Sequence, residues 1–121
     1  MKCVLVTGGR DYRDSDCVFE TLDELKPDLV IEGGAIGADE LVRKWAEAHG
    51  IHYGIFPANW AKRGKAAGPM RNAIMVKIVK ALESAGWECI VVAFPGGRGT
   101  ASCVSIAVDA NLHIRRILDE K

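Results

Sequence analysis

The hydrophobic positions along the chain follow two alternating patterns. Short runs of β-branched and other apolar residues, typical of buried strands, alternate with longer stretches in which apolar residues recur at helical spacing. Strands are expected at residues 3–7, 29–31, 52–56 and 89–94. Helices are expected at residues 15–26, 35–49, 69–84 and 98–109. This alternation is typical of an α/β protein.

Apolar stripes and helix-ending residues support these helices. The third helix is expected to have Pro69 in its first turn. Met70, Ile74, Ile78 and Leu82 form part of its broad apolar face, which is wider than one sheet contact requires. Pro27, Gly50 and Gly86 follow the first three helices as terminators. Residues 112–117 fit either an edge strand or a terminal helical turn, and the pattern leaves both open.

Parallel strands joined by helices need right-handed crossovers. We therefore expect a three-layer Rossmann-like sandwich, a parallel sheet of four or five strands in the order 3-2-1-4-5 with helices on both faces. The 121 residues contain no repeat, low-complexity tract or linker, which indicates one domain over residues 1–121. In such a sheet, ligands bind beyond the carboxyl ends of the strands.

Composition narrows the functional classes. The chain is 49% hydrophobic and 26% charged, which is typical of a folded domain rather than a disordered chain. Its 16 basic and 16 acidic residues balance, so nonspecific nucleic-acid binding and membrane attachment are disfavoured. With no secretory or membrane-spanning pattern, a cytoplasmic protein is expected. The four cysteines are scattered and fit small core residues, and neither a metal site nor a cofactor is expected.

Three glycine-rich turns follow the first, second and fourth strands. Glycine lets a ligand approach the backbone and lets several N–H groups point together, and a helix that begins there favours an anion. The candidate phosphate-binding residues are Gly8, Gly9, Arg10, Gly33, Gly34, Gly37, Gly96, Gly97, Arg98, Gly99 and Thr100. The first turn lacks the spacing of a dinucleotide fingerprint. Glu32 stands where a nicotinamide-binding domain places its ribose-binding acid, although a capping or solvated role fits equally well.

Two of these turns carry a family resemblance. The pairing of Gly-Gly-x-x-Gly at residues 33–37 with Pro-Gly-Gly-Arg-Gly-Thr at residues 95–100 resembles the SLOG superfamily, which includes phosphoribohydrolases and DprA DNA-processing proteins. The opening residues 6–11 and the element at residues 68–72 resemble its YspA/YpsA-related branch more narrowly. The resemblance implies a Rossmann-like fold, a nucleotide-like small-molecule ligand whose phosphate lies on the third turn, and a homo-oligomer, a dimer or larger.

The same resemblance suggests a catalytic arginine, but the family's catalytic glutamate is missing from this chain. Arg71 matches the family arginine, but Cys103 stands where the phosphoribohydrolases have the glutamate that serves in cleavage of the N-glycosidic bond. Asp39 and Glu40 are candidate substitute acids, although acidic residues are also favoured in any first helical turn. Cys103 itself fits either an activated nucleophile or a packed helix face.

The loop expected at residues 57–68 holds a local basic cluster, Lys62, Arg63 and Lys65, beside Trp60. It fits a lid that closes over a phosphate and a base, or a solvated loop. The function expected is binding of a nucleotide or a nucleotide-derived ligand, with or without hydrolysis of the N-glycosidic bond. The alternatives are a DprA-like module that acts on single-stranded DNA and a non-catalytic ligand sensor.

Overall fold

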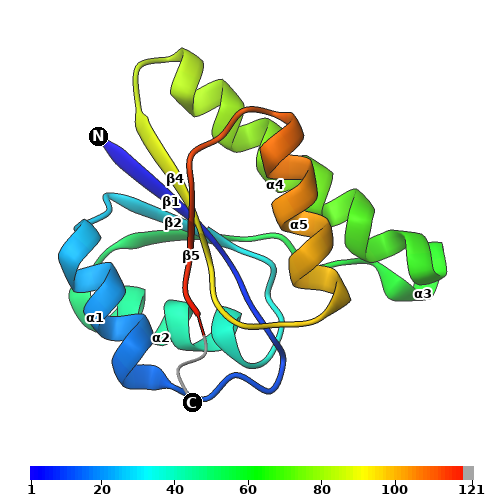
Figure 1. Ribbon diagram of the computed structural model, residues 1–121, viewed down its shortest axis with the longest axis horizontal. Helices are drawn as coiled ribbons and strands as arrows, with labels where there is room; N and C mark the ends of the chain where they lie inside the picture. The colour runs from blue at the N-terminus through cyan, green and yellow to red at the C-terminus, as the bar shows by residue number, and fades with distance from the viewer. Residues whose placement is uncertain (119–121) are drawn as a thin grey trace.

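The computed structural model describes residues 1–118 and contains a single five-stranded parallel sheet (Figure 1). Its strands are β1 (Lys2–Thr7), β2 (Leu29–Glu32), β3 (His52–Ile55), β4 (Glu88–Ala93) and β5 (Ile114–Arg116). Its helices are α1 (Ser15–Leu25), α2 (Ala38–His49), α3 (Trp60–Arg63), the 3-10 helix η1 (Gly64–Ala66), α4 (Ala67–Ser84) and α5 (Arg98–Asp109). The strand order β3-β2-β1-β4-β5 confirms the expected topology, and the segment left open is an edge strand.

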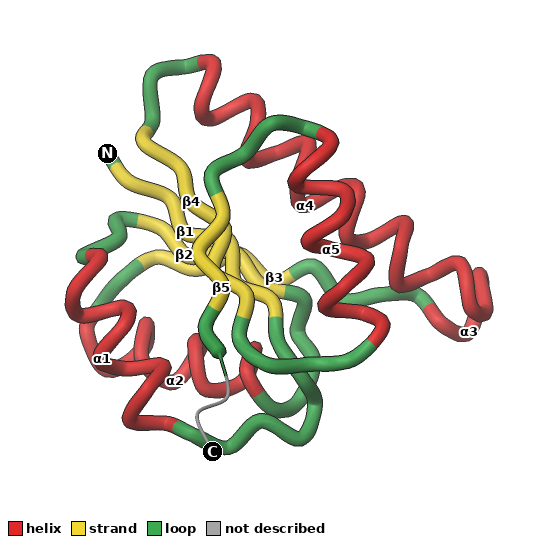
Figure 2. The backbone as a smooth tube through the Cα atoms, viewed as in Figure 1, coloured by secondary structure: helices red, strands yellow, loops and turns green. Residues whose placement is uncertain are grey.

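Both faces of the sheet are covered. Along β1, Val4 and Val6 point into one core cluster, and the alternating Cys3 and Leu5 point into the other. Figures 1 and 2 show α1 and α2 on one side of the sheet and α4 and α5 on the other. Because β1 is buried on both faces, its sequence is continuously apolar rather than alternating. Within residues 1–118, no helix is both long enough and apolar enough to span a membrane.

Only part of the broad apolar face expected on α4 is buried. Met75, Val76 and Val79 are the residues that α4 buries against the sheet, whereas Met70 and Ile74 are 40% and 52% exposed. Apolar residues occur almost all around this helix, so helical spacing alone allows more than one stripe. The crossing of α4 over the sheet and α5 selects the stripe that becomes core.

The segment expected to be a long loop is largely helical. Residues 60–63 form α3, η1 follows it, and α4 begins two residues before Pro69. The side chain of Asn59 caps α3 by accepting a hydrogen bond from the Lys62 amide at 3.2 Å. Figure 2 shows that this helical segment projects at the N-terminal end of α4, away from the sheet.

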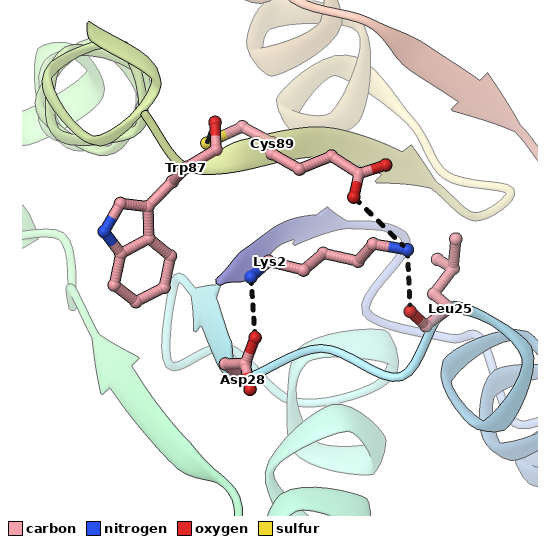
Figure 3. A network of polar contacts seen from close by, with 6 residues as sticks. Lys2, Leu25, Asp28, Trp87 and Cys89 are labelled. Carbon is pink, nitrogen blue, oxygen red and sulfur yellow. Dashed lines mark hydrogen bonds and ion pairs between the residues drawn. The ribbon is translucent and has the colours of Figure 1, made fainter. Parts of the chain in front are cut away.

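Lys2 holds together the edge of the sheet at which the strands begin (Figure 3). Its backbone N–H donates to Asp28 at 2.7 Å, and its Nζ donates to the Leu25 carbonyl at 2.9 Å. Lys2 Nζ also lies 3.9 Å from a carboxylate oxygen of Glu88. These contacts join the starts of β1, β2 and β4 to the end of α1, and the opposite edge carries the glycine-rich turns.

Candidate functional site

The three glycine-rich turns contact one another at the carboxyl edge of the sheet. The carbonyl of Gly9 accepts a hydrogen bond from the Ala38 amide at 3.1 Å, which joins the first turn to the second. The amide of Gly9 donates to the Pro95 carbonyl at 2.9 Å, which joins the first turn to the third. The predicted binding residues on these turns are therefore neighbours in space as well as in pattern.

Glycine is required where the turns approach most closely. Gly37 has a φ of +83°, and a Cβ there would collide with the carbonyl oxygens of Gly9 and Arg10. A Cβ on Gly96 would collide with the Thr100 hydroxyl and would lie 2.7 Å from the Gly9 amide nitrogen. These two glycines set the spacing between the turns.

The second turn uses its backbone amides to hold two buried carboxylates. One oxygen of Glu32 accepts from the Gly34 amide at 2.8 Å. One oxygen of Asp39 accepts from the amides of Gly33 and Ala35 at 3.1 and 3.3 Å. The amides of Gly33 and Gly34, which the sequence suggested for phosphate, thus already have anionic acceptors within the protein.

The two carboxyl groups are strongly affected by burial. Glu32 is 1% exposed and Asp39 is 6% exposed, and Glu32 Oε1 and Asp39 Oδ1 have no hydrogen-bond partner among the described residues. Burial raises the pKa of Glu32 from 4.5 to about 7, with a smaller contribution from the nearby Asp39. Burial also raises the pKa of Asp39 from 3.8 to about 6. Both groups therefore change protonation near neutral pH, as functional carboxyls often do.

Arg71 connects α4 to the ends of β2 and β3. Its Nη1 donates to the Gly33 carbonyl at 2.6 Å and to the Phe56 carbonyl at 3.3 Å, and its Nε donates to the Asn72 side chain at 2.9 Å. Its positive charge lowers the pKa of both buried carboxyls against the larger effect of burial. Arg71 thus lies beside the acidic pair and orders the second turn.

Asn72 is a site residue to which the sequence analysis assigned no role. It is 3% exposed, and its amide nitrogen donates to the Gly99 carbonyl at 3.3 Å and lies 3.5 Å from the Ser102 hydroxyl. Through Asn72, the arginine on α4 is connected to the first turn of α5. A polar amide directly after Arg71, followed by an apolar run at residues 73–76, was the signal available in the sequence.

The third turn has free amides. Helix α5 begins after Gly97 without a side-chain cap, and residues 96–99 are exposed. Among residues 1–118, no hydrogen bond from the amides of Gly97, Arg98 or Gly99 is observed. Arg10 is also exposed on the neighbouring first turn. Unpaired N–H groups at the start of a 12-residue helix, near two arginines, favour an anion.

A cleft of about 320 Å³ opens on the other side of the second turn, beside α2 and the end of β3. Its lining residues are Glu32, Gly34, Ala35, Ile36, Glu40, Arg43 and Ile55. Glu40, one of the candidate acids, is partly exposed here and pairs with Lys44 at 3.2 Å. Glu40 and Asp39 therefore differ sharply in environment although they are adjacent in the sequence.

Comparison with known proteins identifies the family of this chain. The sequence profile of the YspA, cpYpsA-related SLOG family matches residues 2–62. The "Gene 61 protein" of Mycobacterium phage D29 is 35% identical to this chain over an alignment of 126 residues including gaps, and the alignment covers 94% of each protein. The chain belongs to the YspA, cpYpsA-related SLOG family. Membership in this SLOG family points to a role in binding a nucleotide-related ligand.

Cys103, which the family resemblance aligns with the glutamate of the phosphoribohydrolases, is a core residue. It is fully buried between α5 and the sheet. Burial raises the pKa of its thiol to about 11, so the thiol stays protonated at neutral pH. This environment supports the packed helix face rather than the activated nucleophile.

The basic cluster of this SLOG domain lies on α3 and η1. Lys62, Arg63 and Lys65 are exposed, and Trp60 is 56% exposed with its ring against Gly68. Figure 1 shows α3 at the edge of the molecule, beyond the N-terminal end of α4. In this conformation the segment extends away from the sheet and does not fold over the turns.

Proposed function

We propose that this SLOG domain binds a nucleotide or a nucleotide-derived phosphorylated ligand, with the phosphate at the start of α5. The single observation that carries the proposal is that the amides of Gly97, Arg98 and Gly99 have no hydrogen-bond acceptor within residues 1–118. Thr100 would donate a hydroxyl hydrogen bond, and the side chains of Arg10 and Arg98 would neutralise charge. We leave Gly33 and Gly34 out of the phosphate site because their amides hold carboxylates.

The test is calorimetric titration of nucleoside monophosphates into the wild type and a Gly99→Glu variant. A Cβ at Gly99 meets no atom within 4 Å, and an acidic residue is compatible with a first helical turn, so the variant should fold. Its carboxylate would repel a phosphate, so we expect binding to be lost. Ser105→Glu, an exposed position further along α5, adds the same charge and should bind normally. Equal binding by all three proteins would contradict the proposed phosphate site.

Hydrolysis of the N-glycosidic bond is the catalytic extension of this proposal. It needs a carboxylate in place of the missing family glutamate, and Asp39 fits better than Glu40 because it is buried, retains an unpartnered oxygen and lies near Arg71. Chromatographic detection of free base after incubation with nucleoside monophosphates tests this step. If the wild type releases no base from any common nucleotide, the domain is a binding protein and not a hydrolase.

A second candidate function is binding of single-stranded DNA, and one observation favours it. Trp60 is largely exposed beside three cationic side chains, an arrangement that suits base stacking and backbone neutralisation. Such binding should weaken steeply with salt. The absence of a mobility shift with single-stranded DNA at low salt would remove this candidate.

A further inference from the structure

The cleft beside α2 contains two buried polar groups that have no hydrogen-bond partner among the described residues. Glu32 Oε1 is an acceptor without a donor, and Arg43 Nε is a donor without an acceptor. Both residues line the same cleft. Native proteins rarely leave such groups unpaired, and each instance calls for an explanation. Two complementary unpaired groups in the wall of one cleft point to a ligand that pairs with both.

The two groups are complementary to each other but do not bond. No hydrogen bond or ion pair joins Glu32 to Arg43, and the nearest carboxylate partner of Arg43 is Glu47, with Arg43 Nε and Glu47 Oε1 4.0 Å apart. Glu32 cannot simply turn its free oxygen away, because its other oxygen is held by the Gly34 amide at 2.8 Å. Glu32 therefore holds a fixed, deeply buried acceptor in the cleft wall, and Arg43 contributes a buried N–H donor to the same wall.

Two exposed isoleucines give the cleft wall its apolar surface, beside the partly exposed carboxylate of Glu40. Ile36 is 51% exposed and Ile55 is 41% exposed, and both contribute to the cleft wall. Apolar side chains beside an acceptor and a donor suit a planar heterocycle, whose faces are apolar and whose edge is polar. The volume of about 320 Å³ lies at the lower end of the range of ligand pockets, so it suits a ring rather than a whole nucleotide.

We propose that this cleft binds the nucleobase of the ligand, with an N–H of the base donating to Glu32 Oε1 and a neighbouring acceptor of the base receiving the Arg43 Nε–H. The inference rests on the proposed function, because it places the base relative to a phosphate on α5. The cleft lies at the ends of β2 and β3, which are two and three strand spacings from β4, or ~10 and ~14 Å. A nucleoside monophosphate with its phosphate on the third turn would lie extended across the first and second turns to reach the cleft.

The experiment compares two probes on the same proteins by calorimetric titration. The first is a nucleoside monophosphate, with the adenine, guanine, cytosine and uracil forms tested in turn, and the second is ribose 5-phosphate, which lacks a base. The proteins are the wild type, Glu32→Gln, Arg43→Lys and the control Glu20→Gln, an exposed position on α1. In Glu32→Gln the side-chain carbonyl must face the Gly34 amide, so the variant presents an NH₂ donor where the wild type presents an acceptor.

We expect the wild type to bind at least one monophosphate more tightly than ribose 5-phosphate. Glu32→Gln should lower the affinity for that monophosphate by about tenfold or more, which is the effect of losing a hydrogen bond to a charged group. The affinity for ribose 5-phosphate should not change. Arg43→Lys keeps the charge but removes the Nε–H. It should also lower the affinity for the monophosphate and leave the affinity for ribose 5-phosphate unchanged. Glu20→Gln should match the wild type for both probes.

Three results would overturn the inference, and they are distinguishable. If all monophosphates and ribose 5-phosphate bind equally and Glu32→Gln changes nothing, the phosphate site stands and the base cleft does not. If Glu32→Gln lowers the affinity for ribose 5-phosphate as much as the affinity for the monophosphate, Glu32 contacts the sugar rather than the base. If neither probe binds the wild type, the proposed function fails and the inference fails with it.

Discussion

Replacing Glu32 by glutamine should stabilise the protein at alkaline pH and leave it unchanged at acid pH. The reason is that the folded protein holds this carboxyl in a buried environment, where burial raises its pKa from 4.5 to about 7. A raised carboxyl pKa means that the folded state binds the proton more tightly than the unfolded chain does. The contribution of Glu32 to stability is therefore fully present below about pH 4.5 and is lost as pH rises to about 7.

The magnitude follows from that pKa difference. At ~1.4 kcal/mol for each pH unit between 4.5 and about 7, ionised Glu32 lowers the free energy of unfolding by ~3 kcal/mol at pH 8. Glutamine keeps an acceptor for the Gly34 amide and carries no charge, so the variant avoids this loss. For a chain of 121 residues, ~3 kcal/mol corresponds to a rise in Tm of roughly 10 °C.

The assay is thermal unfolding followed by circular dichroism, with wild type and variant compared at pH 4, 6 and 8. Asp39 also has a raised pKa and is present in both proteins, so the difference between their Tm values reports Glu32 together with its electrostatic coupling to Asp39. Glu40→Gln is the matched control, because Glu40 lines the same cleft but is partly exposed and paired with Lys44. A Tm gain that is equal at pH 4 and pH 8, or absent at pH 8, would refute the reasoning.

Three further predictions test the packing of the site. Gly37→Ala should lower the urea midpoint by the equivalent of ~2 kcal/mol or more, because its Cβ would meet two carbonyl oxygens at a positive φ, whereas Gly99→Ala meets no atom and should be neutral or stabilising. Native-state alkylation at pH 8, followed by mass spectrometry, should modify the half-buried Cys17 well before Cys103, and rapid modification of Cys103 would restore the nucleophile hypothesis. Asn72→Ala should destabilise the fold by ~2–3 kcal/mol in urea unfolding, because it removes the partner of the Arg71 Nε–H and the bond to α5, and an unchanged midpoint would contradict this role.

Much of the architecture could be predicted because the relevant physics is local and periodic. A strand segment buried on both faces must be continuously apolar, and residues 3–6 of β1 and 89–93 of β4 show this in their sequence. Once strands and helices alternate, right-handed crossovers leave few sheet orders, and the carboxyl ends of the strands meet at one edge. The proximity of the three glycine turns follows from that topology. The homo-oligomer suggested by the family resemblance stays a prediction.

Other features of the fold escaped the periodic pattern. α4 is apolar on several sides, so the pattern did not show that Met70 and Ile74 stay exposed while other apolar residues of the helix form its core face. The helix α3 was missed because four residues are too few to show a period, although Asn59 is a favourable cap. The burial of residues on α4 and the conformation of α3 both depend on what packs against these segments.

The sequence by itself determined the sheet, the order of its strands and the edge at which the site lies. The hydrophobic period of neighbouring residues identifies the strands and helices, and their order along the chain limits how the strands can be arranged. Only the tertiary structure decided the chemistry at that edge. It placed Arg71 against the Gly33 carbonyl, 38 residues away in the chain, and it gave the amides of the second turn to Glu32 and Asp39. Burial by distant segments then raised the pKa of both carboxyls. Desolvation sums over all atoms around a group, so no local pattern of residues reports it.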